Sequence, residues 1–204
     1  MKTSGVKRAA LGVHMHSGWG VLVAVSGDAG SLEVLERRRI VTADPTIEGA
    51  KQPYHFAENL GLREAERYLA NCTAISDRLA FEVIKAVVGN LEARQHSIAG
   101  CAVLLASGRA LPSLPKILAS HALIHTAEGE FFRDAVKNAC ERLGVPVAAI
   151  KERDLDDRAR TVFGNEASRV QCRIWSLGSS IGPPWTKDHK TAALAAAIML
   201  AAQR

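Results

Sequence analysis

The pattern of apolar and polar positions divides the chain into regions of different period. Three short segments, 9–15, 20–26 and 32–41, are apolar or alternate between apolar and polar residues, and the turn-forming sequences SGWG and GDAG separate them. Short runs of this kind joined by tight glycine-containing turns are typical of β-strands. The first part of the chain is therefore predicted to form an antiparallel meander of three strands.

A helical period replaces this pattern from about residue 60 to residue 95. Apolar residues recur there at spacings of three and four, as in Leu62, Ala65 and Leu69. This spacing places them on one face of a helix, so the region is predicted to be one long helix or two in sequence. The preceding segment 47–61 (IEGAKQPYHFAENLG) contains many turn formers and no clear period, and it is predicted to be a loop.

The second half of the chain alternates strands and helices. The run 98–106 (IAGCAVLLA) is apolar on both faces, which predicts a strand buried in the middle of a sheet. Helical sequence extends from 114 to 143 with an interruption near Gly129. The remaining predicted elements are a strand at 145–150 and helices at 155–163, 167–177 and 188–203, the last of them capped by Thr186 or Asp188. The order is therefore βββ, α, β, α, β, α.

This order resembles that of the ribonuclease H-like fold, an α/β architecture with a mixed five-stranded sheet and helices on both faces. Within it, the chain is similar over most of its length to RuvC-type Holliday-junction resolvases. The segments that carry the resemblance are 11–20 (LGVHMHSGWG), 161–165 (TVFGN) with Gln171, and 188–197 (DHKTAALAAA). The resemblance implies a single ribonuclease H-like domain over 1–204.

The same resemblance implies where catalytic acids are expected. Enzymes of this class cleave phosphodiesters with two divalent ions held by carboxylates on the first strand, the fourth strand and the last helix. Here His14 stands at the first-strand position, the segment 98–106 has no acid, and Asp188 is followed one turn later by Thr191 or Ala192. One carboxylate does not make a two-metal site, so we expect the fold without a complete nuclease site.

The fold nevertheless predicts a pocket where the first and fourth strands end beside the last helix. Gly12, His14 and His16 share one side of the first strand. His14 and His16 are candidate ligands of a divalent metal such as Zn²⁺, or a general base; otherwise one is hydrogen-bonded in the sheet and the other is exposed in the turn. From the other two elements the pocket would receive Ser107, Gly108 and Arg109, and Asp188, His189 and Lys190.

Each of these neighbours has a candidate role. Gly108 and Arg109 could cradle an anion, although a loop after a strand needs glycine anyway. Ser107 could act as a nucleophile if the fold brings His14 or His125 next to it. Asp188 is the candidate catalytic acid of the last helix, and His189 and Lys190 are candidate ligand-binding residues.

A second pair of histidines lies outside this pocket. His121 and His125 have the i, i+4 spacing that places two imidazoles on one helix face, which is half of a metal site. Glu128 is a candidate ligand-binding residue beside them. Thr126 could instead cap a new helix whose first turn carries Glu128 and Glu130, which would complement the helix dipole.

The charge balance changes this picture only slightly. The chain has 26 Lys and Arg against 21 Asp and Glu, a net charge of +5, which favours an anionic partner without demanding nucleic acid. The densest basic cluster is Arg37, Arg38 and Arg39, which a solvated strand edge explains better than a phosphate site. The tryptophans Trp19, Trp175 and Trp185 could stack on a planar ligand or serve as packing residues.

The cysteine content and the hydropathy of the chain indicate the compartment in which the protein is expected to work. Four cysteines occur singly, with no C-x-x-C pair, and are expected to be reduced thiols. No apolar run is long enough to span a membrane, and histidines and Ser17 interrupt the apolar segment after the basic N-terminus, so we expect a cytoplasmic protein that does not enter membranes. The apolar segment 192–202 could form a core face or the interface of a homodimer.

Three functions are compatible with these residues. The first is a binding or regulatory module that has lost the two-metal site. The second is a histidine- or metal-dependent hydrolase of a phosphorylated or nucleotide-like substrate. The third is a divergent structure-selective nuclease that takes acids from unexpected positions such as Asp188 and Glu128. Nucleic acid or a nucleotide-like anion is the expected partner, and whether the two histidine pairs meet depends on the tertiary structure.

Overall fold

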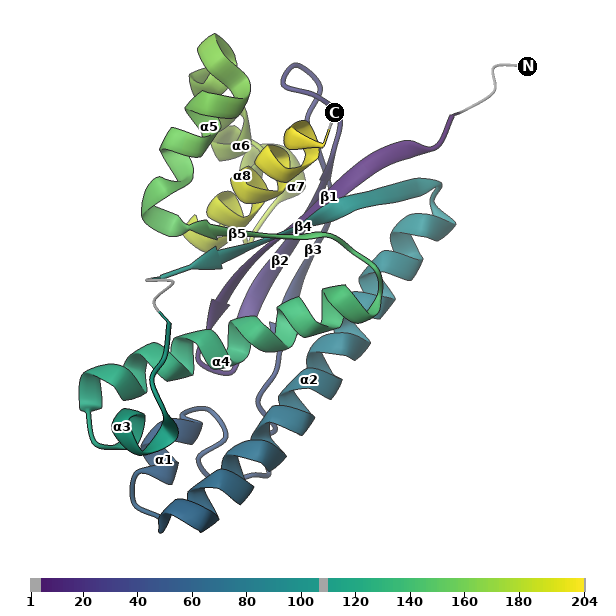
Figure 1. Ribbon diagram of the computed structural model, residues 1–204. Helices are drawn as coiled ribbons and strands as arrows, with labels where there is room; N and C mark the ends of the chain where they lie inside the picture. Colours follow the sequence, from purple (N-terminus) through teal and green to yellow (C-terminus); the bar gives the residue numbers. More distant parts are fainter. Residues whose placement is uncertain (1–4, 107–109, 204) are drawn as a thin grey trace.

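The computed structural model describes residues 5–106 and 110–203, and it contains the predicted meander. A five-stranded sheet has the order β3-β2-β1-β4-β5 (Figure 1). Its first three strands pair antiparallel, whereas β4 pairs parallel with β1 and with β5. The strands are β1 (Lys7–His16), β2 (Trp19–Ser26), β3 (Glu33–Val41), β4 (His96–Leu105) and β5 (Val147–Lys151).

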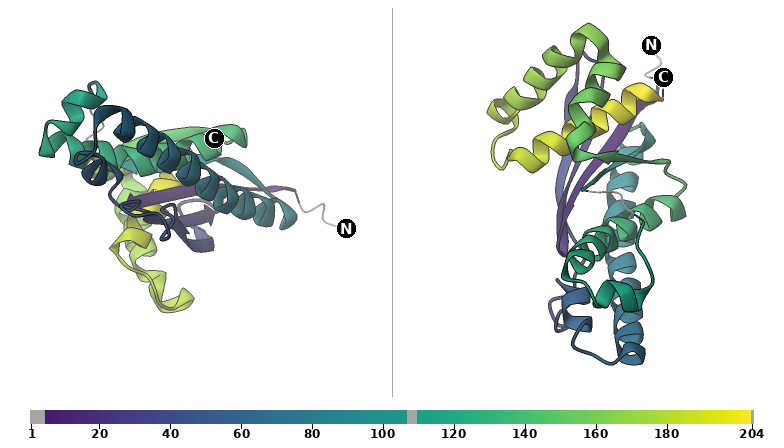
Figure 2. Two further views of the ribbon diagram at one scale, coloured as in Figure 1. Left: turned by 90° about the horizontal axis from the view of Figure 1, so that it is seen from below. Right: turned by 60° about the vertical axis from the view of Figure 1, so that its left-hand side comes forward.

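Helices cover both faces of this sheet, as the views in Figures 1 and 2 show. One face carries α2 (Leu62–Ala93) and α4 (His121–Arg142), and the other carries α5 (Leu155–Phe163), α6 (Ala167–Ser176) and α8 (Lys187–Ala202). The shorter helices are α1 (Pro53–Ala57), α3 (Leu114–Leu118) and α7 (Gly178–Ile181), with 3-10 turns η1 (Glu152–Asp154) and η2 (Gly164–Glu166). The α/β fold class and the mixed five-stranded sheet are confirmed.

The alternation of side chains along β1 is also confirmed. Leu11, Val13 and Met15 pack in the core on the side of α2 and α4. Gly12 faces α8 so closely that a β-carbon added there would meet the backbone of Ala192 and Ala196. The glycine lets the last helix lie directly against the first strand, which places the start of α8 beside the end of β1.

The last helix is a core element. Every residue from 191 to 200 is buried, so within the described chain this segment forms a core face, and the alternative of a homodimer interface is wrong for it. Of the two predicted caps, the structure has Thr186, whose side chain and the side chain of His189 form a capping box. The run of alanines explains the close fit, because small side chains let the helix approach the sheet.

Two predictions of local structure are wrong. The segment 47–61 is not entirely loop, because it contains the short helix α1. No new helix begins at Thr126: α4 starts at His121 and continues through Gly129, and the Thr126 hydroxyl donates to the carbonyl of Ala122 inside it. A glycine within a helix costs only about 1 kcal/mol, which the packing of the buried face of α4 outweighs.

The basic cluster lies on β3, which is an edge strand as predicted, but its arginines are not merely solvated. The Arg37 guanidinium donates hydrogen bonds to the carbonyl oxygens of four consecutive residues, 181–184, in the connection before α8. Arg39 lies over the Trp19 ring, with its Cζ 4.1 Å from the ring centroid. Arg38 forms an ion pair with Glu36, so each of the three arginines has a specific structural partner.

The cysteines are free thiols, as expected, and three of them are buried. Among the helices that the structure describes, none combines the length and hydropathy needed to cross a bilayer.

Candidate functional site

Two histidines at the end of β1 meet the first turn of α8. His14 and His16 point to the same side of the strand, and Asp188 lies opposite them. Each of the three side chains offers one ligand atom, and these atoms all lie within 4.8 Å of one another. The structure thus brings together three of the residues that the sequence assigned to this pocket.

His14 is held in a defined orientation. Its Nδ1 lies 3.2 Å from the Thr191 hydroxyl oxygen, which is also within 3.2 Å of the carbonyl oxygens of Lys187 and Asp188. Nδ1 also lies 3.6 Å from Asp188 Oδ1, and Nε2 lies 3.6 Å from a carboxylate oxygen of Glu152. Carboxylates on both sides of the ring favour a proton or a cation at its nitrogens.

Burial lowers the pKa of His14 below its usual value, an effect that the carboxylates of Glu152 and Asp188 partly offset. The His14 side chain is only 12% exposed. The neutral imidazole is the form that binds metals, so the surroundings of His14 favour the ligand form near neutral pH.

His16 is fixed by contacts on two sides. Its Nε2 donates a hydrogen bond to Asp188 Oδ2 at 2.9 Å, and its ring stacks on Trp19 with centroids 4.5 Å apart. Since Arg39 also lies against the Trp19 ring, the tryptophan acts here as a support for His16. Trp19 therefore has a packing role at the edge of the site.

Glu152 is a site residue that the sequence reasoning missed. It is the first residue of η1 and follows β5 directly, and its other carboxylate oxygen lies 3.3 Å from Nζ of Lys187. A signal for it exists in the sequence: β1, β4 and β5 are parallel, and the carboxyl ends of parallel strands meet at one edge of a sheet. An acid immediately after β5 was therefore a candidate on topology alone.

A cleft of about 390 Å³ opens next to this cluster. His16, Trp19 and Arg133 line it, and so do His125 and Glu128 from the second histidine group. Arg133 is largely buried; its Nε donates to the Leu104 carbonyl, which holds the guanidinium in place. One histidine of each pair, His16 and His125, therefore lines the same cleft.

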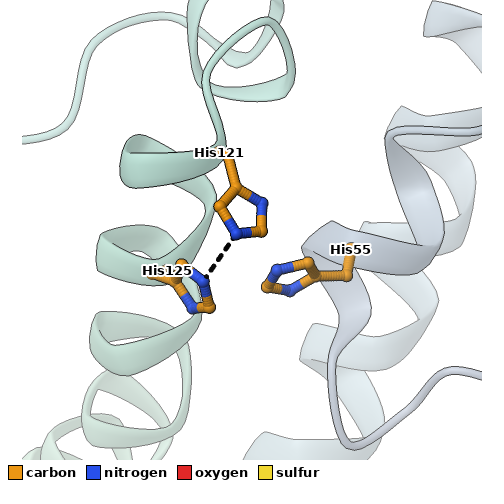
Figure 3. Close-up of side chains that lie close together, drawn as sticks. All are labelled: His55, His121 and His125. Atoms are coloured by element: carbon orange, nitrogen blue, oxygen red, sulfur yellow. Dashed lines mark hydrogen bonds between the residues drawn. The ribbon is translucent and has the colours of Figure 1, made fainter.

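The second pair gains a third histidine from a distant part of the chain. His121 and His125 in the first turns of α4 meet His55 of α1, and the three rings converge in Figure 3. The sequence reasoning missed His55 because it assigned the segment to a loop. Glu128 is not an exposed acid in a first helical turn: it is 3% exposed and contacts His55.

Other candidates lie elsewhere. The His189 side chain is part of the cap of α8, where its Nδ1 lies 2.8 Å from the Thr186 hydroxyl, and Lys190 lies 5.9 Å from the Trp175 ring. Trp185 donates its indole N–H to the carbonyl of Ile174, which is a packing role. Ser107, Gly108 and Arg109 lie outside the described residues.

The donor set at the first cluster discriminates between metals. Two magnesium ions need mainly oxygen ligands, and the described residues gather here only two carboxylates, Asp188 and Glu152, beside two imidazoles. This set does not fit a pair of magnesium ions. Mixed imidazole and carboxylate ligands suit a single ion of the zinc class.

No protein-family model matches the chain, and no curated protein matches it. Among solved structures, it is similar to Thermus thermophilus RuvC in complex with a Holliday junction substrate, with 14% identity, a TM-score of 0.48, and coverage of 94% of this chain and 91% of that one. A second structure of Thermus thermophilus RuvC gives 17% identity and a TM-score of 0.47 over the same shares of both chains. Function is therefore inferred from the residues of the site alone.

Proposed function

We propose that this protein is a metal-dependent hydrolase of phosphate esters in a nucleotide or nucleic acid, with His14, His16 and Asp188 as the ligands of one zinc-class ion. The observation that carries the proposal is the convergence of these three donors within 4.8 Å at the end of β1. When bound, such an ion polarises a phosphoryl oxygen and makes a bound water more acidic.

The neighbouring residues supply the rest of the chemistry. Glu152 faces His14, and its side chain is 37% exposed, so water reaches its carboxylate, which acts as the proton acceptor. Arg133 brings a positive charge to the cleft, where a phosphate would bind. These two residues favour an anionic substrate and hydrolysis over simple binding.

Hydrolysis of bis(4-nitrophenyl) phosphate, and of fluorescently labelled single-stranded and four-way-junction DNA, tests the proposal. The full-length protein is stripped with EDTA and reloaded separately with Zn²⁺, Mn²⁺ or Mg²⁺. We expect cleavage that depends on the zinc-class ion and is abolished by Asp188→Asn. Replacing Glu152 by Gln should lower kcat/KM by about 10²- to 10⁴-fold, the range for loss of a general base.

The matched control is Asp157→Asn, which removes an exposed carboxylate on α5 that pairs with Arg160 and leaves the cluster intact. Its activity should equal that of the unmodified protein. Absence of hydrolysis with every ion would overturn the proposal. Salt-dependent DNA binding without cleavage would instead support a binding module.

A further inference from the structure

The cluster of His55, His121 and His125 is independent of the first site. Nε2 of His121 and Nε2 of His125 lie 3.1 Å apart, and the ring of His55 lies 4.7 Å from that of His125 and 5.3 Å from that of His121. One ligand atom from each ring falls within 4.8 Å of the other two. The three imidazoles therefore present nitrogen atoms to a common point (Figure 3).

This spacing is the spacing of ligands around one ion. Nitrogens bound to Zn²⁺ at about 2.0–2.1 Å and at tetrahedral angles lie roughly 3.4 Å from one another. The distance of 3.1 Å between the two α4 histidines already approaches this value. It follows from the i, i+4 spacing on a helix, which places both side chains on one face.

Glu128 supplies the outer contact that metal-binding histidines commonly have. Its Oε1 lies 2.9 Å from Nδ1 of His55, which is buried, although the two atoms lack the alignment of a hydrogen bond. The same oxygen accepts the backbone N–H of His55 at 3.2 Å. A carboxylate next to one ring nitrogen orients the imidazole and leaves the other nitrogen, Nε2, for an ion.

We propose that His55, His121 and His125 form a second metal site, which binds a zinc-class divalent ion through three imidazoles. His121 and His125 are exposed, so a fourth position is open to water or to a ligand from solution. Three neutral nitrogen donors without a carboxylate ligand suit Zn²⁺, Ni²⁺, Cu²⁺ or Co²⁺ and disfavour Mg²⁺ and Ca²⁺.

Such an ion would join parts of the chain that are distant in sequence. It would tie α1, a helix of only five residues, to the start of α4. His125 and Glu128 also line the cleft that the first cluster borders through His16. The second ion would therefore fix one wall of the cleft.

Titration of the EDTA-stripped, full-length protein with Co²⁺ and with Zn²⁺ tests this site. The visible spectrum of Co²⁺ reports its coordination geometry, and calorimetry gives the number of bound Zn²⁺ ions. If both sites exist, we expect two ions per chain. His125→Gln should bind one ion fewer and lose a distinct component of the Co²⁺ spectrum, and Glu128→Gln should weaken the second site by about 10- to 100-fold.

Two variants keep this test separate from the proposed function. His16→Gln removes an imidazole from the first cluster and should abolish hydrolysis while it keeps the second ion. Glu141→Gln, an exposed position on α4, should bind as the unmodified protein does. Equal Co²⁺ uptake and spectra in the unmodified protein and in folded His125→Gln would refute the second site, whatever the result for hydrolysis.

Discussion

His16 and Asp188 are 172 positions apart in sequence, yet Nε2 of the histidine lies 2.9 Å from Oδ2 of the aspartate. The contact joins the end of β1 to the first turn of α8. It exists because Gly12, which precedes His16 on the same strand, allows α8 to pack directly against β1. The candidate site therefore depends on one close approach between strand and helix.

The two members of this pair should act as a unit. We expect His16→Gln and Asp188→Asn each to weaken Zn²⁺ binding at the first cluster by at least about tenfold, and the double variant to lose much less than the sum of the two free-energy changes. Calorimetric titration of all four proteins measures this coupling. Fully additive changes would contradict a shared site.

Gly12→Ala should destabilise the fold, because the added β-carbon meets the α8 backbone. Overpacking of this kind costs about 1–3 kcal/mol, and urea denaturation measures it. Gly89→Ala is the matched control: its β-carbon meets nothing within 4 Å, and it lies inside α2. Alanine there should raise the free energy of unfolding by about 0.5–1 kcal/mol. Equal effects of both changes would argue against the tight packing of β1 on α8.

Arg37→Ala should lower the free energy of unfolding by about 2–3 kcal/mol, because a charged donor of several hydrogen bonds is lost. Arg78→Ala removes an exposed arginine paired with Glu82 and should change the free energy of unfolding by less than about 1 kcal/mol. Thermal and urea unfolding compare the two variants. If Arg37→Ala changes the free energy of unfolding as little as Arg78→Ala does, the hydrogen bonds of Arg37 do not stabilise the fold.

Glu128→Ala should loosen α1, because the carboxylate that accepts the backbone N–H of His55 is lost. We expect faster hydrogen exchange of amides in 53–57 and a loss of about 1–3 kcal/mol in the free energy of unfolding. Glu141→Ala removes an exposed acid from the same helix and should leave both quantities nearly unchanged. Unchanged exchange in 53–57 would show that the contact does not hold α1.

One cysteine should react quickly with a thiol reagent in the native protein. Cys172 is exposed, whereas Cys72, Cys101 and Cys140 are buried. We expect one fast equivalent under native conditions and four after denaturation, followed by mass spectrometry. Cys172→Ser should remove the fast equivalent, and fast labelling of a second thiol would indicate local opening of the core.

Features that depend on the local spacing of apolar and polar residues were predictable from the sequence. Alternation along the first strand placed His14 and His16 on one side of it, and the i, i+4 spacing placed His121 and His125 on one helix face. The order of strands and helices predicted the mixed five-stranded sheet through its resemblance to the ribonuclease H-like fold.

The residues that complete each cluster were identified from the packing of distant elements. Glu152 reaches His14 through the parallel pairing of β4 and β5, and His55 reaches α4 through the packing of a short helix whose sequence has no clear period. Gly129 and Thr126 suggested a helix boundary, but burial of the α4 face outweighed that local preference. The spacing of apolar and polar residues depends on neighbouring positions in the sequence. The convergence of side chains depends instead on how distant elements pack.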